Sequence, residues 1–295
     1  MTAAAALPNF LAPDELRVRP DGDGRLVIDP QRAGWRHLSF RTEPLAAGGA
    51  IHLGSERSET VVILIAGGDV TADLGARQVR LAGRTSVFDG LPSAIYLPPG
   101  AMAQLSTSSG CMLAVAEAPA SGRAGVSADA VVIGPEDVRV EVRGAGNATR
   151  QINHIIAPDF PADRLEVVEV FTPSGNWSSW PPHKHDTDDM PREAVLEEIY
   201  YYQLRRPEGW GIQRLYRADG SRDALWAVRH GELVLVTDGY HPFAAAHGYD
   251  AYYLNALAGD RRTMACSYDP DLDWIRDSWT DMEPDPRVPL VGRGS

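Results

Sequence analysis

The 295-residue sequence has only two cysteines, Cys111 and Cys266, and neither belongs to a metal-binding or redox motif. A disulfide framework is therefore not expected. The longest apolar run, VVILIA at 61–66, is far too short to cross a bilayer. The first residues, MTAAAALPNF, lack the basic residues and the long apolar core of a secretory signal. We therefore expect a cytoplasmic protein with no membrane partner.

Basic residues are also scarce. The chain has 28 Lys and Arg against 40 Asp and Glu, a formal net charge of −12. Nucleic acid demands a basic surface, so the charge argues against a nucleic-acid partner. Neither common glycine-rich phosphate loop is present, and we predict no nucleotide cofactor. A small anionic substrate remains possible, because a pocket can be locally basic in an acidic protein.

The dominant pattern is a series of short β-type runs separated by Gly, Pro and Asp. They include HLSFRTEPL, ETVVILIAGG, QVRLAG, AIYLPPG and CMLAVAEAP in the first half, and RLEVVEVFTP, EEIYYYQL, GIQRLYRA, LWAVRHGELVLV and YDAYYLNALAG in the second. Many short strands with regular turn signals indicate an all-β sandwich or barrel. The small, polar stretch at 120–130 is the candidate linker.

The two halves resemble each other. SETVVILIAGG (58–68) and LEEIYYYQLRRPEG (196–209) each place a glutamate at the head of a strand that ends in a turn. Similar segments in the same order predict a duplicated β-barrel, with one domain over 1–125 and another over 126–295. The first copy has no His-x-His before its glutamate, Glu59. We therefore expect the first barrel to be metal-free.

The stretch WPPHKHDTDD (180–189) suggests a metal site. In an extended segment His183 and His185 share one face, and one of the two glutamates in LEEIYYY can point into the same barrel. A later strand and glycine turn bring His241. Three histidines and a glutamate predict a site for one divalent ion with positions open for substrate. These ligand types suit zinc, manganese, iron or nickel alike.

These residues resemble the two cupin motifs. Gly175, His183, His185 and Glu198 match the first motif, and GELVLVTDGYH, ending in His241, matches the second. The resemblance thus implies His183, His185, Glu198 and His241 as metal ligands. A loop at 186–195 is inserted between His185 and Glu198, and His241 arrives one residue early. His247 therefore remains a rival for the last ligand.

Longer segments are similar to one family in particular. SGNWSSWPPHKHD, LEEIYYYQ, GWGIQRLY, AVRHGELVLV and GYHPFAAAHGYDAYYLN resemble the 5-deoxy-glucuronate isomerases of myo-inositol catabolism, most closely over about 139–275. The resemblance implies a bicupin, with two double-stranded β-helix (jelly-roll) barrels in one chain. It also implies an aldose–ketose isomerase that converts 5-deoxy-D-glucuronate to 5-dehydro-2-deoxy-D-gluconate through a metal-stabilised enediolate.

Such a reaction needs a proton shuttle and a grip on the substrate's carboxylate. The candidate bases are Glu197, His154 and His230, with Asp186 as a further option. The candidate substrate-binding residues are Lys184, Tyr202, Arg214, Arg229 and Tyr240, with Arg143 and Arg150 as alternative carboxylate anchors. Exposed sheet edges in bicupins often pair between subunits, which makes a homo-oligomer possible.

Three other functions fit parts of the pattern. The same ligand set could activate oxygen, as in dioxygenases and oxalate-processing cupins. The barrel could instead act as a receptor for a sugar acid. A storage bicupin would need neither an open metal site nor pocket arginines.

Overall fold

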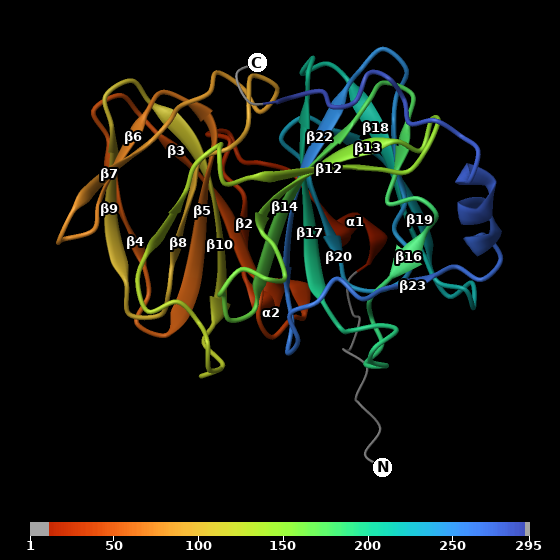
Figure 1. The fold of residues 1–295 in the computed structure, drawn as a ribbon, viewed down its shortest axis with the longest axis horizontal. Helices are drawn as coiled ribbons and strands as arrows, with labels where there is room; N and C mark the ends of the chain where they lie inside the picture. The colour runs from red at the N-terminus through yellow and green to blue at the C-terminus, as the bar shows by residue number, and fades with distance from the viewer. Residues whose placement is uncertain (1–11, 293–295) are drawn as a thin grey trace.

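The computed structural model describes residues 12–292. Residues 1–10, on which the prediction of no secretory signal rests, lie outside the described residues. The chain forms two β-sandwiches side by side (Figure 1). Every strand pairing within the sheets is antiparallel among the described residues. In this part of the chain no helix is long and apolar enough to cross a membrane.

The first sandwich contains two sheets of six and four strands. The six-stranded sheet runs in the order β11 (Val131–Ile133), β8 (Ala94–Leu97), β5 (Ser58–Gly67), β10 (Cys111–Pro119), β3 (Ser39–Leu45) and β2 (Val27–Ile28). The four-stranded sheet runs β4 (Ala50–Gly54), β9 (Met102–Thr107), β6 (Val70–Asp73) and β7 (Gln78–Leu81).

The second sandwich is built around a seven-stranded sheet. Its order is β1 (Arg17–Val18), β20 (Leu233–Val236), β17 (Glu197–Leu204), β22 (Ala251–Ala258), β14 (Leu165–Thr172), β13 (Arg150–Ile156) and β12 (Arg139–Arg143). The opposing strands are β15 (Trp177–Ser178), β21 (Phe243–Ala245), β18 (Trp210–Tyr216) and β19 (Asp223–Arg229), with the pair β16 (His183–Lys184) and β23 (Ser267–Tyr268) beside them.

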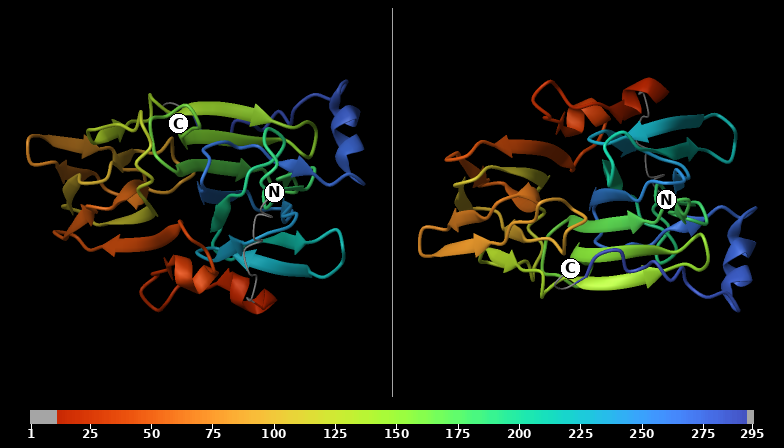
Figure 2. Two further views of the ribbon diagram at one scale, coloured as in Figure 1. Left: turned by 90° about the horizontal axis from the view of Figure 1, so that it is seen from below. Right: turned by 90° about the horizontal axis from the view of Figure 1, so that it is seen from above.

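Between residues 12 and 292, helices are few and short. They are α1 (Pro13–Leu16), α2 (Pro30–Ala33) and the 3₁₀ helix η1 (Asp273–Trp279). Figure 2 shows the same side-by-side barrels from below and above, with the N-terminal elements reaching across to the second barrel. There, β1 pairs with β20. Conversely, β11 lies beyond residue 125 but pairs with β8 of the first sandwich. Sheet membership thus crosses the predicted boundary in both directions.

The run that reads VVILI in β5 is apolar at every position because both of its faces are buried. Val62 and Leu64 pack into a core confined to the first barrel. Val61, Ile63 and Ile65 pack into a larger core shared with the second barrel. The six- and seven-stranded sheets therefore join the two barrels through apolar side chains.

Two buried glutamates join the barrels reciprocally. Glu59 at the head of β5 accepts hydrogen bonds of 2.6–2.7 Å from the backbone N–H groups of residues 163–165, at the start of β14. Glu197 at the head of β17 accepts bonds of 2.6–2.9 Å from the N–H groups of residues 36–38, just before β3. Each carboxylate thus fixes the entry of the chain into a strand of the other barrel.

These two contacts are expected to contribute strongly to stability. Because hydrogen bonds to a buried charge are worth about 1.5–3 kcal/mol each, Glu59→Ala and Glu197→Ala should each lower the free energy of unfolding by at least about 3 kcal/mol. Urea unfolding measures this. Glu56→Ala, three residues away and exposed, is the control and should change it by less than about 0.5 kcal/mol. Equal effects of all three substitutions would contradict the proposed contribution of the Glu59 and Glu197 hydrogen bonds to stability.

Candidate active site

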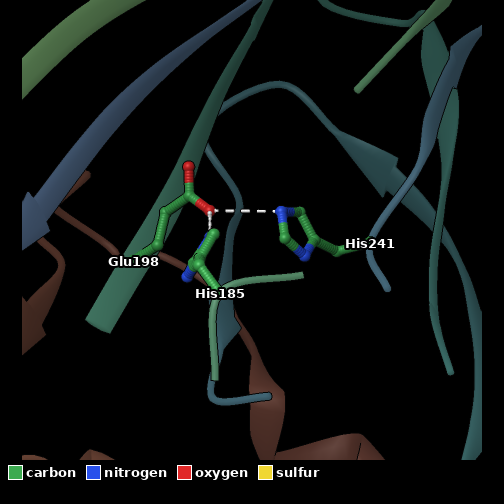
Figure 3. A group of neighbouring side chains, drawn as sticks. All are labelled: His185, Glu198 and His241. Atoms are coloured by element: carbon green, nitrogen blue, oxygen red, sulfur yellow. Dashed lines mark hydrogen bonds and ion pairs between the residues drawn. The ribbon is translucent and has the colours of Figure 1, made fainter. Parts of the chain in front are cut away.

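Three side chains converge inside the second barrel. His185 follows β16, Glu198 lies on β17, and His241 lies on the connection between β20 and β21. One ligand atom of each lies within 4.8 Å of the others, and all three residues are buried (Figure 3). The predicted strand phase explains Glu198: alternation along β17 points it inward and points Glu197 to the opposite face.

Backbone carbonyls fix how both imidazoles are presented. The Nδ1 atom of His185 lies 2.9 Å from the Leu196 carbonyl, and that of His241 lies 3.0 Å from the Gly239 carbonyl. A carbonyl only accepts, so each Nδ1 carries the proton and donates it. In the neutral ring Nε2 is then a bare acceptor, as a metal ligand must be.

Both bare nitrogens face the same carboxylate. Nε2 of His185 lies 2.8 Å and Nε2 of His241 lies 3.4 Å from Oε2 of Glu198. The His241 nitrogen is buried and has no hydrogen-bond partner within the described chain. Lone pairs that face a buried carboxylate repel it unless a cation lies between them. The donor set and its orphaned nitrogen therefore fit a divalent metal ion.

The charges explain the titration of these rings. Burial lowers the pKa of His241 to about 4, despite the opposing charge of Glu198. Burial also opposes protonation of His185. In the metal-free protein, however, a second proton on Nε2 would donate a hydrogen bond to Glu198, and this bond and the charge of Glu198 outweigh burial and raise the pKa of His185. The buried Glu198 carboxylate thus favours one positive charge between itself and the two imidazole rings.

His183 stands beside this group. Its ring centroid lies 4.7 Å from that of His241 and 6.4 Å from that of His185. Burial, followed by the nearby His241 and His185, holds its pKa well below the ordinary value. His183 is adjacent but is not within the 4.8 Å group of three, so its role as a fourth ligand stays a prediction. His247 is exposed and outside the group.

A pocket opens onto the cluster. Its wall includes polar residues and apolar ones from β13, β14 and β22, and the lining residues are Arg143, Arg150, Ile152, Val168, Val170, Ser179, His183, His185, Leu196, Glu198, Tyr200, Tyr253, Asn255, Leu257, Met264, Cys266 and Tyr268. Ser179 has a left-handed φ of 50°, which is uncommon for a residue other than glycine. Its hydroxyl lies 2.7 Å from that of Tyr200.

None of the three predicted bases lines this pocket. Glu197 is turned away by strand alternation and held by the N–H groups of residues 36–38. His154 pairs with Glu141 through Nε2 at 2.8 Å. His230 is exposed near the end of β19. All three side chains therefore lie outside the pocket wall, and their assignment as catalytic bases stays a prediction.

The predicted arginine and lysine contacts also lie elsewhere. Arg214 makes a two-pronged bond to Asp223, with both distances 2.8 Å, on the outer four-stranded sheet. Arg229, the last residue of β19, is exposed. Lys184 donates to Asp186, Thr187 and Glu193. These three side chains do not line the pocket.

The two predicted tyrosines are core residues. The Tyr202 hydroxyl donates to Gln213, and its ring packs 5.3 Å from that of Phe243. Tyr240 packs 5.3 Å from Tyr216. Tyr202 shares the inward face of β17 with Glu198, but it lies too far along the strand to line the pocket. Neither tyrosine lines the pocket, and the substrate-binding role of both stays a prediction.

Sequence reasoning missed a buried carboxylate behind the pocket. In strand register Glu166 on β14 pairs with Leu257, which pairs with Glu198 on β17. Glu166 is 1% exposed, and neither carboxylate oxygen has a hydrogen-bond partner in the part of the chain described. Burial raises its pKa to about 7, against the influence of Arg262 and His185. The sequence did contain a signal: strand alternation in RLEVVEV places Glu166 on the same face as Val168 and Val170, which line the pocket.

The first barrel differs from the second in the side chains around its glutamate. Within residues 12–292, no second group of histidine, cysteine or acidic side chains meets the spacing for a metal. The Glu59 carboxylate accepts hydrogen bonds from the backbone of residues 163–165. The Tyr96 hydroxyl also donates to this carboxylate, at 2.8 Å. A wide hollow in this barrel is lined mostly by small residues around β6, β9 and the linker. It is separate from the His–Glu cluster.

Comparison with known proteins identifies the family. The model of the KduI/IolB family matches residues 15–275. The chain belongs to the KduI/IolB family. A protein named 5-deoxy-glucuronate isomerase from Geobacillus kaustophilus (strain HTA426) is 39% identical over 261 residues, which are 88% of this chain and 93% of the relative. One of the same name from Halalkalibacterium halodurans is 34% identical over 84% of this chain and 91% of its own length.

Solved structures agree on the fold. An IolB-like protein from Salmonella typhimurium LT2 has a TM-score of 0.84 and 36% identity, and the match covers 88% of this chain and 99% of that one. Oxalate decarboxylase from Lactobacillus farciminis, at 10% identity and a TM-score of 0.59 over 86% and 88% of the chains, shares the fold alone. The predictions of a cupin-type all-β fold, of the family and of an isomerase are confirmed.

The choice between His241 and His247 can be tested directly. His241→Ala should remove bound metal, because it deletes one of three converging atoms, whereas His247→Ala should leave the metal content unchanged. The double variant His183→Ala/His185→Ala should also lose metal. Elemental analysis of the folded proteins measures this. Full occupancy in His241→Ala would refute the ligand set.

Glu166 should make the metal-free protein less stable as pH rises. Its folded-state pKa, about 7, lies above the ordinary value of 4.5, so the folded state retains a proton that the unfolded state has lost. Stability is therefore lost between about pH 4.5 and 7, by up to about 3 kcal/mol. Between pH 5 and pH 8, the stability of Glu166→Gln relative to the native sequence should therefore rise by most of this amount, about 2 to 3 kcal/mol. Urea unfolding after chelation checks this, and a pH-independent difference would contradict it.

Proposed function

We propose that this protein is a divalent-metal-dependent aldose–ketose isomerase that converts 5-deoxy-D-glucuronate to 5-dehydro-2-deoxy-D-gluconate. The substrate is suggested by the names of relatives at 34–39% identity over most of the chain. The observation that carries the chemistry is the pair of bare imidazole nitrogens facing the buried carboxylate of Glu198 at the pocket.

The proposed ligands are His183, His185, Glu198 and His241. A divalent ion held there would supply Lewis-acid stabilisation for the negative charge that develops on the aldehyde oxygen and its neighbouring hydroxyl. The protein's part is to fix the ligand atoms. The carbonyls of Leu196 and Gly239 hold two imidazoles in one tautomer, so little reorganisation is needed when charge develops.

The apolar wall strengthens these interactions. Ile152, Val168, Val170 and Leu257 exclude water from one side of the pocket. Electrostatic attraction is stronger in such a low-dielectric site than in water. The exclusion would also protect a reactive intermediate from side reactions.

Hydroxyl groups complete the polar side of the pocket. Tyr253 lies 2.6 Å from Ser178 through its hydroxyl, and Tyr200 lies 2.7 Å from Ser179. Burial raises the pKa of Tyr200 well above its ordinary value, so its hydroxyl keeps its proton. These fixed hydroxyls are positioned to orient the hydroxyl groups of a sugar acid in the pocket.

The proposed reaction moves hydrogen within one substrate. The metal-loaded protein should form the ketose from 5-deoxy-D-glucuronate without added nicotinamide. Chelation should abolish turnover, and a divalent ion should restore it. Product analysis by NMR measures the conversion, and deuterium from solvent at the new hydroxymethyl carbon would report exchange of the transferred proton.

The same assay separates the alternatives. An oxygen-activating enzyme would consume oxygen with small acids instead of producing ketose. A receptor for sugar acids would bind the substrate and leave it unchanged. If the metal-loaded protein forms no ketose, the proposed function is wrong.

A further inference from the structure

Arg150 is an unusual arginine. It is the first residue of β13 and is 7% exposed. Its Nη1 donates to the backbone carbonyls of Ala148 at 3.2 Å and Trp180 at 3.1 Å. Over residues 12–292, its Nε and Nη2 make no hydrogen bond, and no carboxylate pairs with it. A buried charge without an opposite charge is costly and calls for an explanation.

Other arginines in similar positions are neutralised. Arg84, also buried, pairs with Glu169 across the two barrels. Arg143, opposite Arg150 in strand register, forms a two-pronged pair with Glu141 at 2.7 and 3.0 Å. Arg150 differs from both because, among the described residues, its guanidinium donates only to two backbone carbonyls, and does so through Nη1 alone. The edge that carries Nε and Nη2 remains available.

Arg150 is part of the pocket wall. Arg150 shares its sheet face with Ile152. Val170, the register partner of Ile152, and Tyr253, the register partner of Val170, line the pocket as well. Arg150 lines the same pocket as His183, His185 and Glu198. One ligand could therefore contact both the guanidinium and the His–Glu cluster.

Burial lowers the pKa of Arg150 to about 10, with Arg143 adding to the effect. The group still carries its charge near neutral pH. A bound anion would oppose both influences, since it stabilises the charged form.

We propose that Arg150 binds the carboxylate of the substrate through the Nε and Nη2 edge of its guanidinium, and so selects sugar acids over neutral sugars. This rests on the proposed isomerase function and takes the role predicted from sequence for Arg214. A planar guanidinium matches a carboxylate with two parallel hydrogen bonds. The aldehyde end of the same substrate then lies at the His–Glu cluster.

The test compares two substrates that differ only at the far end of the chain. One is 5-deoxy-D-glucuronate and the other is 5-deoxy-D-glucose, in which a hydroxymethyl group replaces the carboxylate. Arg150→Gln should lower kcat/KM for the uronate about 10- to 100-fold more than for the aldose. Arg150→Lys, which keeps the charge but not the fork, should recover part of the preference.

Arg214→Gln is the matched control, because Arg214 is partly exposed and bound to Asp223. It should leave the preference for the uronate unchanged. A purely structural role for Arg150 would slow both substrates equally. That result, with metal content intact in Arg150→Gln, would overturn the proposal, as would a loss of preference in the control.

A binding measurement tests the proposal even if Arg150→Gln does not fold or the protein is not an isomerase. By calorimetry, the native protein should bind D-glucuronate at least about 10-fold more tightly than D-glucose, and Arg150→Lys should reduce that ratio. Equal affinity of the native protein for both sugars would overturn the proposal even if Arg150→Gln does not fold. If no ketose forms but this selectivity is present, the isomerase proposal alone fails.

Discussion

The alternation of side chains along β17 is the constraint on which the rest of the structure depends. Glu197 and Glu198 are adjacent, so they must point to opposite faces of the sheet. Glu197 reaches the backbone of residues 36–38 and holds the first barrel, while Glu198 faces the two imidazoles inside the second. A shift of one residue would exchange the two roles and destroy both.

The ligand geometry is also held by an inserted loop. Asp186 accepts a 2.8 Å hydrogen bond from the N–H of Gly239, whose carbonyl faces Nδ1 of His241. Glu193 is buried and accepts from Lys184 and from the N–H groups of Asp186 and Thr187. The loop at 186–195, which the sequence placed between two ligands, therefore supports the position of His241 through a short chain of polar contacts.

Sequence patterns predicted local features well. The expected strands in both halves are present, the linker at 120–130 contains neither helix nor strand, and the phase of Glu198 is as predicted. What the sequence did not predict are contacts between distant segments. Alternation turned Glu197 outward, but nothing local shows that residues 36–38 meet it there. Arg214 has aromatic neighbours, yet its strand belongs to the outer sheet and Asp223 on β19 neutralises it.

The duplication explains why only one barrel carries the cluster. Glu59 occupies in the first barrel the place that Glu197 occupies in the second, as the reciprocal hydrogen bonds show. The next residue is Thr60, where the second barrel has Glu198. The copies therefore share the structural glutamate, and only the second adds the inward carboxylate.

Anomalous X-ray diffraction from crystals of the metal-loaded protein tests this account most directly. It predicts one strong peak in contact with Glu198 and with Nε2 of His185 and His241, and no peak at Glu59. A well-occupied ion near Glu59, or an ion held by His247 in place of His241, would contradict it.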